Sequence, residues 1–298
     1  MLCILKLPSA ICLSSLKILR IQRVSFSNEY LTGKLFSGLP VLEEMKLENC
    51  SWGHLKSVSI SAPKLLSIFE DDEQKRKFGN PDFCRVTIVG DRLKEFDYNG
   101  NLIDEYWLLK SSSLEKACIH SGCDGEIVLR MINLLKGLYN VEQLTLDSYV
   151  LWVLMDAYGH LHLMPMFNNL TDLILVGICI EFSALFKILH KSPCLNTLNF
   201  SEGINLTAMP GEENNDWKLD PVPPCFLSNL KQNEVHDFSA LEDDLPAVEY
   251  LLNNAVVLDQ LIITLPDAYK ADFECTTEVC RLLLELSRAS RNCRIILE

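Results

Sequence analysis

The sequence lacks the features of several large classes of protein. Its 298 residues include 27 lysines and arginines against 40 aspartates and glutamates, and the net charge of -13 leaves no basic field for a nucleic acid. No stretch approaches the roughly 20 uninterrupted apolar residues of a membrane-spanning helix. The apolar start is interrupted by Lys6 and has no basic residues before it, unlike a signal peptide. We therefore predict an intracellular, soluble protein of the cytoplasm, the nucleus or both, with neither nucleic acid nor membrane as a partner.

Catalytic and cofactor motifs are missing as well. The sequence contains no G-x-S-x-G, Walker, G-x-G-x-x-G or H-E-x-x-H pattern. Paired carboxylates such as Asp243 and Asp244 suit the first turn of a helix, where negative charge complements the helix dipole. We predict that the protein is not an enzyme, that it has no catalytic residues, and that it uses no cofactor.

Cysteine is abundant, but its arrangement favours neither disulfides nor a metal site. The 12 cysteines are scattered, and most lie in apolar patterns typical of reduced core thiols. Cys118, His120 and Cys123 lie close together, and the first two would share the open side of one strand. A tetrahedral zinc site usually takes four ligands in short-spaced pairs, and no second pair is evident. We therefore predict no metal site.

A leucine-rich step recurs along the chain and is clearest in residues 167–178, FNNLTDLILVGI. Its spacing is that of a leucine-rich repeat, L-x-x-L-x-L. In this step Leu173 and Leu175 would lie on one side of a short strand, while Asp172 and Ile174 lie on the other. The step recurs at intervals of about 21 to 30 residues, starting at Leu16, Leu42, Leu65, Leu93, Leu114, Val141, Leu170 and Leu195.

Helical patterns separate several of these strands. Apolar spacing predicts helices over residues 29–38, 127–138 and 182–189. Tyr106 and Trp107 are interpreted as packing residues between two strands, and residues 70–77 as a charged loop. Since one such unit cannot bury its apolar face alone, stacked units share a core. We predict an α/β fold, a leucine-rich-repeat solenoid in which a curved parallel sheet carries helices on its outer side.

Composition divides the chain into three parts. Residues 1–207 carry the repeats, and the acidic, polar residues 208–220 predict a linker or loop. Residues 221–298 form a C-terminal α/β segment that we expect to cap the solenoid. In this segment we predict strands over 227–235, 258–264 and 294–297 and helices over 245–254 and 277–286.

The last segment resembles the FBD region of plant F-box/leucine-rich-repeat proteins. The residues that carry the resemblance are Trp217, PVPPCFLSNL at 221–230, Phe238, LED at 241–243, VEYLLNNAVVL at 248–258, and LSRAS at 286–290 with Cys293 and Ile295. Residues 7–21, 37–50 and 166–175 are similar to that family's repeats. The resemblance implies the substrate-recognition subunit of a cullin-type ubiquitin ligase, in which an N-terminal F-box docks on the ligase's linker subunit and the repeats hold the target.

Two hypotheses follow from this resemblance. Met1 is followed almost at once by the first repeat, so we expect either a fragment or a naturally F-box-less relative. The first hypothesis is a non-catalytic adaptor that binds a protein target, with the linker subunit as a further partner only if an F-box lies upstream. The alternative is an F-box-less scaffold or competitor that recruits no ligase. A small molecule held beneath the target is a third possibility.

Strand alternation identifies candidate partner-facing positions. These residues would point away from the core, and their acidic bias predicts a partner with a basic or mixed-charge surface. Plain solvated strand faces would show the same pattern. The candidates are Arg20, Glu44, Lys46, Glu95, Asp97, Lys116, His120, Gln143, Asp147, Asp172 and Asn199.

Overall fold

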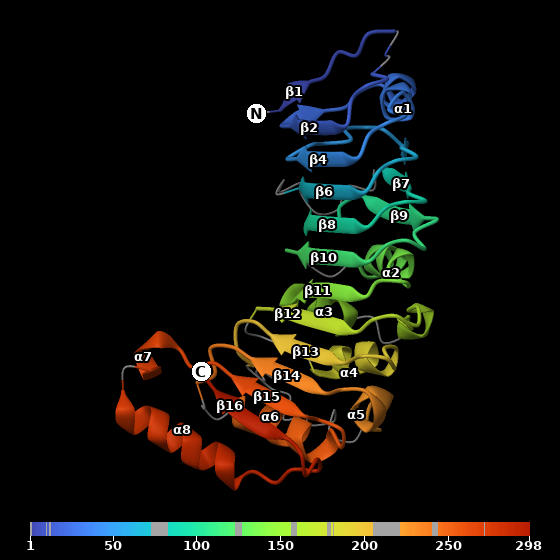
Figure 1. Cartoon of the computed structure of the whole chain (residues 1–298). Helices are drawn as coiled ribbons and strands as arrows, with labels where there is room; N and C mark the ends of the chain where they lie inside the picture. The colour runs from blue at the N-terminus through green and yellow to red at the C-terminus, as the bar shows by residue number, and fades with distance from the viewer. Residues whose placement is uncertain are drawn as a thin grey trace. The chain divides into compact units, whose positions relative to one another are not determined.

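The chain folds into two compact units built on parallel strands (Figure 1). Unit 1 comprises Met1–Glu142 and Asp156–Pro165, and unit 2 comprises Gln143–Met155 and Met166–Glu298. The computed structural model describes residues 2–9, 11, 13–72, 83–122, 127–155, 160–177, 180, 182–204, 221–239, 244–270 and 272–298, except for the side chains at 72, 161 and 275.

Unit 1 contains five parallel strands that repeat in register. They are β2 (Ile18–Gln22), β4 (Glu44–Glu48), β6 (Ser67–Asp72), β8 (Glu95–Gly100) and β10 (Lys116–Ser121). One inward row includes Met45, Ile68, Phe96 and Ala117, and each of these four side chains is at most 3% exposed. The leucine-rich step therefore does what its spacing predicts, since equivalent positions of successive repeats share one core.

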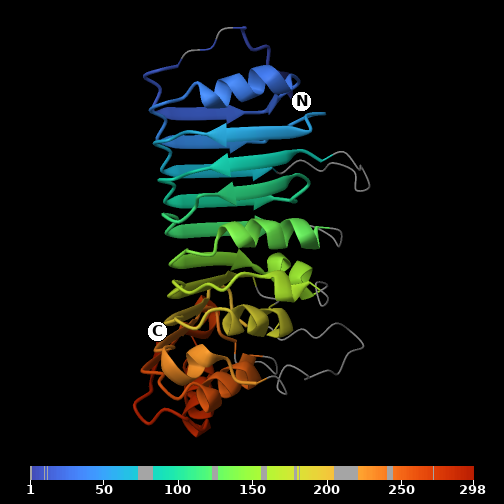
Figure 2. The same cartoon turned by 90° about the vertical axis from the view of Figure 1, so that its right-hand side faces the viewer.

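The outer layer of unit 1 combines helices with a second sheet. The strands β5 (Ser57–Ser61), β7 (Arg85–Val89) and β9 (Glu105–Leu109) pair in parallel. Helix α1 (Glu29–Ser37) contacts β5 and α2 (Val128–Gly137) contacts β9 (Figure 2), so helices cover both edges of this sheet. The helices predicted in unit 1 are confirmed, and the outer layer also contains strands β5, β7 and β9, which were not predicted. The sequences SVSIS and RVTIV alternate β-branched and polar residues, which favours strands. A further parallel pair joins β1 (Cys3–Ile4) to β3 (Val24–Ser25).

The predicted charged loop over residues 70–77 is corrected at its start, where Glu70 lies in strand β6. Residues Glu70–Asp72 end strand β6, and residues 73–77 lie outside the described residues. The Glu70 side chain points inward, is 3% exposed and accepts a hydrogen bond from the Tyr106 hydroxyl, which in turn accepts one from Trp52 Nε1 at 3.4 Å. Burial, together with the charge of Glu70, raises the pKa of Tyr106 well above its usual range. Tyr106 lies in β9 and packs inward as predicted, and its hydroxyl supplies a hydrogen bond to the buried carboxylate of Glu70.

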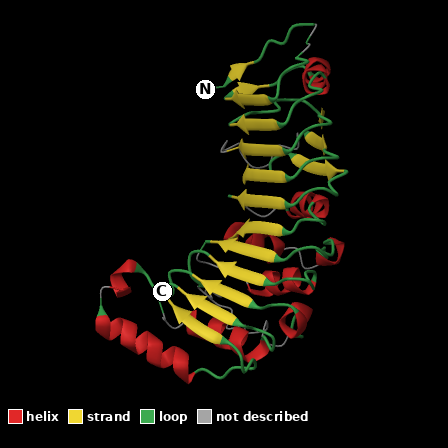
Figure 3. Ribbon diagram, in the orientation of Figure 1, coloured by secondary structure: helices red, strands yellow, loops and turns green. Residues whose placement is uncertain are grey.

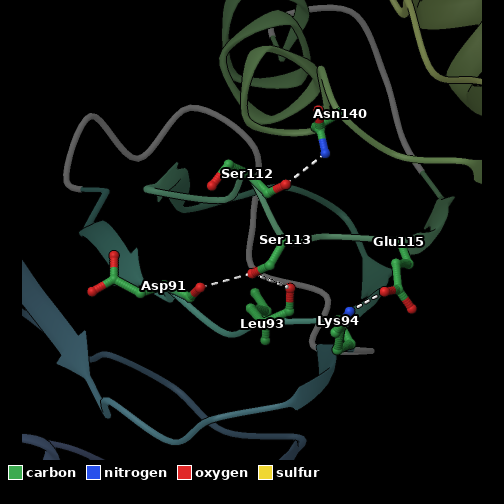
Figure 4. A network of polar contacts seen from close by, with 7 residues as sticks. All are labelled: Asp91, Leu93, Lys94, Ser112, Ser113, Glu115 and Asn140. Carbon is green, nitrogen blue, oxygen red and sulfur yellow. Dashed lines mark hydrogen bonds and ion pairs between the residues drawn. The ribbon is translucent and has the colours of Figure 1, made fainter.

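Short turns at the start of the strands fix the register of unit 1. The Oγ of Ser113, just before β10, donates to the backbone carbonyls of Asp91 at 2.9 Å and Leu93 at 3.2 Å in the previous turn (Figure 4). In the same turns Lys94 forms an ion pair with Glu115. These contacts link the turns that precede β8 and β10, and so help to set the register of the two strands.

Unit 2 continues the repeat with six parallel strands, β11 (Gln143–Asp147), β12 (Asp172–Val176), β13 (Thr197–Phe200), β14 (Gln232–Val235), β15 (Gln260–Ile263) and β16 (Arg294–Leu297). One inward row includes Leu144, Leu173, Leu198 and Leu261, all at most 1% exposed. Asn233 occupies the same row between two leucines and is fully buried. The connections carry α3 (Ser148–Met155), α4 (Phe182–His190), α5 (Pro224–Ser228), α6 (Asp244–Asn254), α7 (Asp267–Lys270) and α8 (Phe273–Glu285).

Most predicted elements of unit 2 are confirmed, and two are corrected. The strand predicted over residues 227–235 exists only as β14, because Pro224 favours the first turn of helix α5 instead. Helix α3 was not predicted, since its sequence SYVLWVLM is apolar on nearly every side and lacks helical periodicity. Figure 3 shows α4 and α5 on one side of the strands of unit 2 and α7 and α8 away from that side. Nowhere in the described ranges does a helix combine the length and apolar character needed to cross a bilayer.

Candidate protein-binding surface

The outward side chains of the unit 1 strands form a surface that we call the unit 1 face. Register aligns them in three rows that run across the strands, and seven of the eleven predicted candidates lie in these rows. In strand order the rows are Ile18, Glu44, Ser67, Glu95 and Lys116; Arg20, Lys46, Phe69, Asp97 and Cys118; and Gln22, Glu48, Asp71, Asn99 and His120.

Exposure follows the predicted alternation. Arg20, Glu44, Glu95 and Lys116 are exposed, while the outward residues nearer the middle of the face are half-buried. The intervening residues of β4 and β8 are buried, as the burial patterns of these strands show. The structure therefore places all seven candidates of unit 1 on the side away from the core.

The middle row joins a half-buried aromatic ring to charges of both signs. Phe69 has Lys46 on one side and Asp97 on the other. The Lys46 ammonium lies 4.6 Å from the centre of the Phe69 ring and 2.6 Å from Glu48 Oε1. Burial and the carboxylate of Glu95 raise the pKa of Asp97, and the charge of His120 acts in the opposite direction. The surroundings of Asp97 thus disfavour the charged form of its carboxyl group.

The unit 2 face is the corresponding set of outward side chains on β11 to β16. It carries the remaining four candidates, Gln143, Asp147, Asp172 and Asn199. Its first complete row, from β11 to β16, is Gln143, Asp172, Thr197, Gln232, Gln260 and Arg294. Its second complete row is Thr145, Ile174, Asn199, Glu234, Ile262 and Ile296. Asp147 and Val176 belong to a third row.

Polar side chains of neighbouring strands are linked on the unit 2 face. Asn199 Nδ2 donates to Glu234 Oε2 at 2.5 Å, and Gln232 Nε2 donates to Glu234 Oε1 at 2.5 Å. His236 Nε2 lies 3.5 Å from the same Glu234 oxygen that Asn199 contacts. These contacts hold a small cluster of donors and acceptors at the middle of the face.

Asp147 has a structural role that its outward position did not predict. Its Oδ1 accepts a hydrogen bond from the backbone N–H of Val150 at 2.9 Å, where helix α3 begins. This is the contact of a helix N-cap. Of the eleven candidates, Asp147 therefore has a local explanation that requires no partner.

The list of partner-facing candidates left out the apolar members of both faces, although the leucine-rich step already predicted an outward Ile174. Phe69, Ile174, Ile262 and Ile296 are all outward and half-buried. The prediction considered polar residues only, although strict alternation assigns these four residues to the same side. Protein-binding surfaces combine such apolar anchors with a polar surround, so the two faces contain both components.

The described cysteines form no disulfide. Cys50, Cys84, Cys225 and Cys293 are buried, whereas Cys3 and Cys194 are exposed. Burial raises the pKa of Cys225 to about 12, which keeps it an unreactive core thiol. Cys118 and His120 share the open side of β10 as predicted, while Cys123 lies outside the described residues. In the part of the chain that the structure covers, no group of three or more potential metal ligands comes together.

The repeated strands and their outer connections define an α/β protein of the leucine-rich-repeat class. Residues 219–263 match the FBD family model. A solved structure, the crystal structure of a TLR13–ssRNA13 complex, aligns with a TM-score of 0.33 and 14% identity over 85% of this chain and 40% of that chain.

Three relatives from Arabidopsis thaliana carry related names. An F-box/LRR-repeat protein is 29% identical and covers 85% of this chain and 56% of its own length. A putative F-box/FBD/LRR-repeat protein is 26% identical, with 97% and 63% covered. An FBD-associated F-box protein is 25% identical, with 96% and 62% covered. These matches and the FBD domain confirm the resemblance to the plant F-box/FBD/LRR family.

The chain spans about three fifths of the length of these relatives. The fold and the names of the relatives indicate a role in protein interaction.

Proposed function

We propose that this chain is the target-recognition part of an F-box-type adaptor of a cullin-RING ubiquitin ligase, and that the unit 1 and unit 2 faces bind the protein target. The names of the relatives support the adaptor role. The observation that supports the binding role is the row Lys46, Phe69 and Asp97, in which a half-buried ring lies between opposite charges on a solvent-facing sheet.

The chemistry of the unit 1 face favours a target of mixed charge. Arg20 and Lys46 supply positive charge on β2 and β4, and Glu95 and Asp97 supply negative charge on β8. Burying Asp97 close to a second carboxylate, Glu95, lowers stability, as the raised pKa of Asp97 indicates. Such a cost is common at functional sites, where charge is kept for binding.

We further propose that residues 208–220 separate a repeat region, 1–207, from an FBD-type segment, 221–298, which caps the stack. Support comes from β14, which pairs with β13, and from β16, which ends the strand order. Ligase adaptors of this kind act inside the cell, so we place this protein in the cytoplasm or nucleus.

The ligase role is tested with the protein encoded by the full-length transcript. Tagged protein is purified from plant cells and probed for the ligase's linker subunit, with the 298-residue chain as the matched control. Binding by the full-length protein and not by this chain supports the adaptor. A full-length protein that captures target proteins without linker subunit would contradict it and favour the alternative, a scaffold or competitor that recruits no ligase.

The binding role is tested by charge reversal once a target has been verified. We expect Glu95→Lys with Asp97→Lys to weaken target binding by at least about tenfold, because two charges on the unit 1 face change sign. The control variant, Asp91→Lys with Glu249→Lys, makes the same change in net charge at exposed positions outside both faces. Equal effects of the two variants would contradict a role for the unit 1 face. Asp147 is left out of the reversal because it caps helix α3.

A further inference from the structure

Cys118 and His120 form a thiol–imidazole pair on the unit 1 face. They lie two residues apart on β10, and their side chains therefore point to the same side of the sheet. The Sγ of Cys118 is 3.1 Å from Nε2 of His120, and both side chains are half-buried. This contact distinguishes Cys118 from Cys3 and Cys194, the described cysteines that are exposed.

One group next to the pair, the Asp97 carboxylate, supports proton transfer from sulfur to nitrogen by favouring a protonated imidazole. Asp97 lies opposite Cys118 on β8, and its carboxylate interacts with His120. Glu95 on β8 and Lys116 on β10 are the other charged groups of these two strands close by. A neighbouring carboxylate stabilises a protonated imidazole, and an imidazole in contact with a thiol can accept its proton as the sulfur attacks.

We propose that Cys118 is a nucleophilic thiol and a site of covalent modification by peroxides, with His120 as its general base. In the reaction, the Cys118 proton passes to Nε2 of His120 and the sulfur attacks one oxygen of the peroxide. An S–O bond forms and the O–O bond of hydrogen peroxide breaks, and the departing hydroxide takes the proton from His120 and becomes water. Cys118 is left as a sulfenic acid, so the sulfur is oxidised by two electrons and the peroxide is reduced. The product lies in the middle row of the unit 1 face, where it adds a polar group beside Asp97.

The inference does not depend on the ligase role, and it is tested on the purified chain. The protein is treated with hydrogen peroxide in the presence of dimedone, which traps sulfenic acids, and each cysteine is followed by peptide mass spectrometry. We expect Cys118 to be labelled at least about tenfold faster than Cys3 and Cys194. His120→Gln should lower the Cys118 rate to the level of those two thiols, while His54→Gln, a change at an exposed histidine outside the unit 1 face, should leave it unaltered.

Far-ultraviolet circular dichroism of each variant confirms that the strands remain folded. A second reagent, iodoacetamide, checks nucleophilicity without oxidation, since the sulfur then displaces iodide. Cys118 reacting no faster than Cys3 and Cys194 with both reagents would overturn the proposal. A fast Cys118 that His120→Gln does not slow would overturn the role of His120 as its base.

Discussion

Leu173 and Ile174 in strand β12 allow the division between core and open face to be measured within one strand. Leu173 is fully buried and lies in register between Leu144 and Leu198, which are also fully buried. Ile174 is its neighbour, half-buried, between Thr145 and Asn199 on the unit 2 face. Replacing each with aspartate makes a similar chemical change in opposite environments.

The expected magnitudes differ widely. Removing a buried leucine side chain costs about 2–5 kcal/mol, and burying an unpaired carboxylate adds several kcal/mol. The sum is comparable with the whole stability of a typical domain, about 5–15 kcal/mol, so we expect Leu173→Asp not to fold. Ile174→Asp should cost about 1 kcal/mol or less because the carboxylate can remain hydrated.

The assay is urea denaturation at pH 7 followed by far-ultraviolet circular dichroism. Leu173→Ala, expected to lose about 2–5 kcal/mol, provides a measurable value if Leu173→Asp yields no folded protein. Asp172→Ala, which removes an acceptor for the Thr171 hydroxyl, should be mild. A loss at Ile174→Asp as large as that at Leu173→Asp would refute the assignment of the two faces.

Four further predictions concern packing, capping and charge. Gly137→Ala should destabilise the protein by roughly 1–3 kcal/mol in the same urea titrations, because its added carbon would lie 2.5 Å from Leu108 Cβ. As the matched control, Gly33→Ala, with open space around it, should stabilise helix α1 by up to about 1 kcal/mol. Asp147→Ala should lower the free energy of unfolding by about 1 kcal/mol, and Asp147→Asn should lower it much less, since asparagine also caps helices. Equal losses for the two variants in urea titrations would contradict the capping role of Asp147. Asp97→Asn should raise the free energy of unfolding at pH 7 by roughly 0.5 kcal/mol or less, because the folded state raises the pKa of this carboxyl and so disfavours its charged form. The gain should vanish as pH falls below about 4, where the carboxyl is protonated in the folded and the unfolded protein. Burial would raise the pKa of Glu105, but hydrogen bonds from Arg85 and Asn133 and the charge of Arg85 lower it. The contribution of Glu105 to stability should therefore be present above about pH 5 and be lost on acidification, and Glu105→Gln should flatten that part of the pH–stability curve.

The sequence was sufficient to predict the strands whose inward residues repeat. Leucine spacing located β4, β8, β10, β11, β12 and β13, because burial on one side of a strand leaves a period of two. The outer layer of unit 1 was harder to predict. Strands β5, β7 and β9 lie outside the leucine-rich step, and whether such segments form strands or helices depends on the neighbouring segments with which they pair.

Strand alternation predicted part of the candidate surface. Alternation gave the outward side of each strand, but not which outward residues meet across strands, since that depends on register. The grouping of Lys46, Phe69 and Asp97 became visible only with β4, β6 and β8 aligned. The burial of polar residues such as Glu70 and Asn233 was not predicted either, because residues of these types are usually exposed.

The most direct test of the account is to map where a captured target touches the chain. A photo-crosslinking benzophenone amino acid is placed at Glu44 on the unit 1 face and, as a matched position, at Ser59 on the outer sheet, both of which are exposed. We predict crosslinks to the target from position 44 and not from position 59. Crosslinks from position 59 alone would show that the target binds the outer layer, and would contradict the central claim.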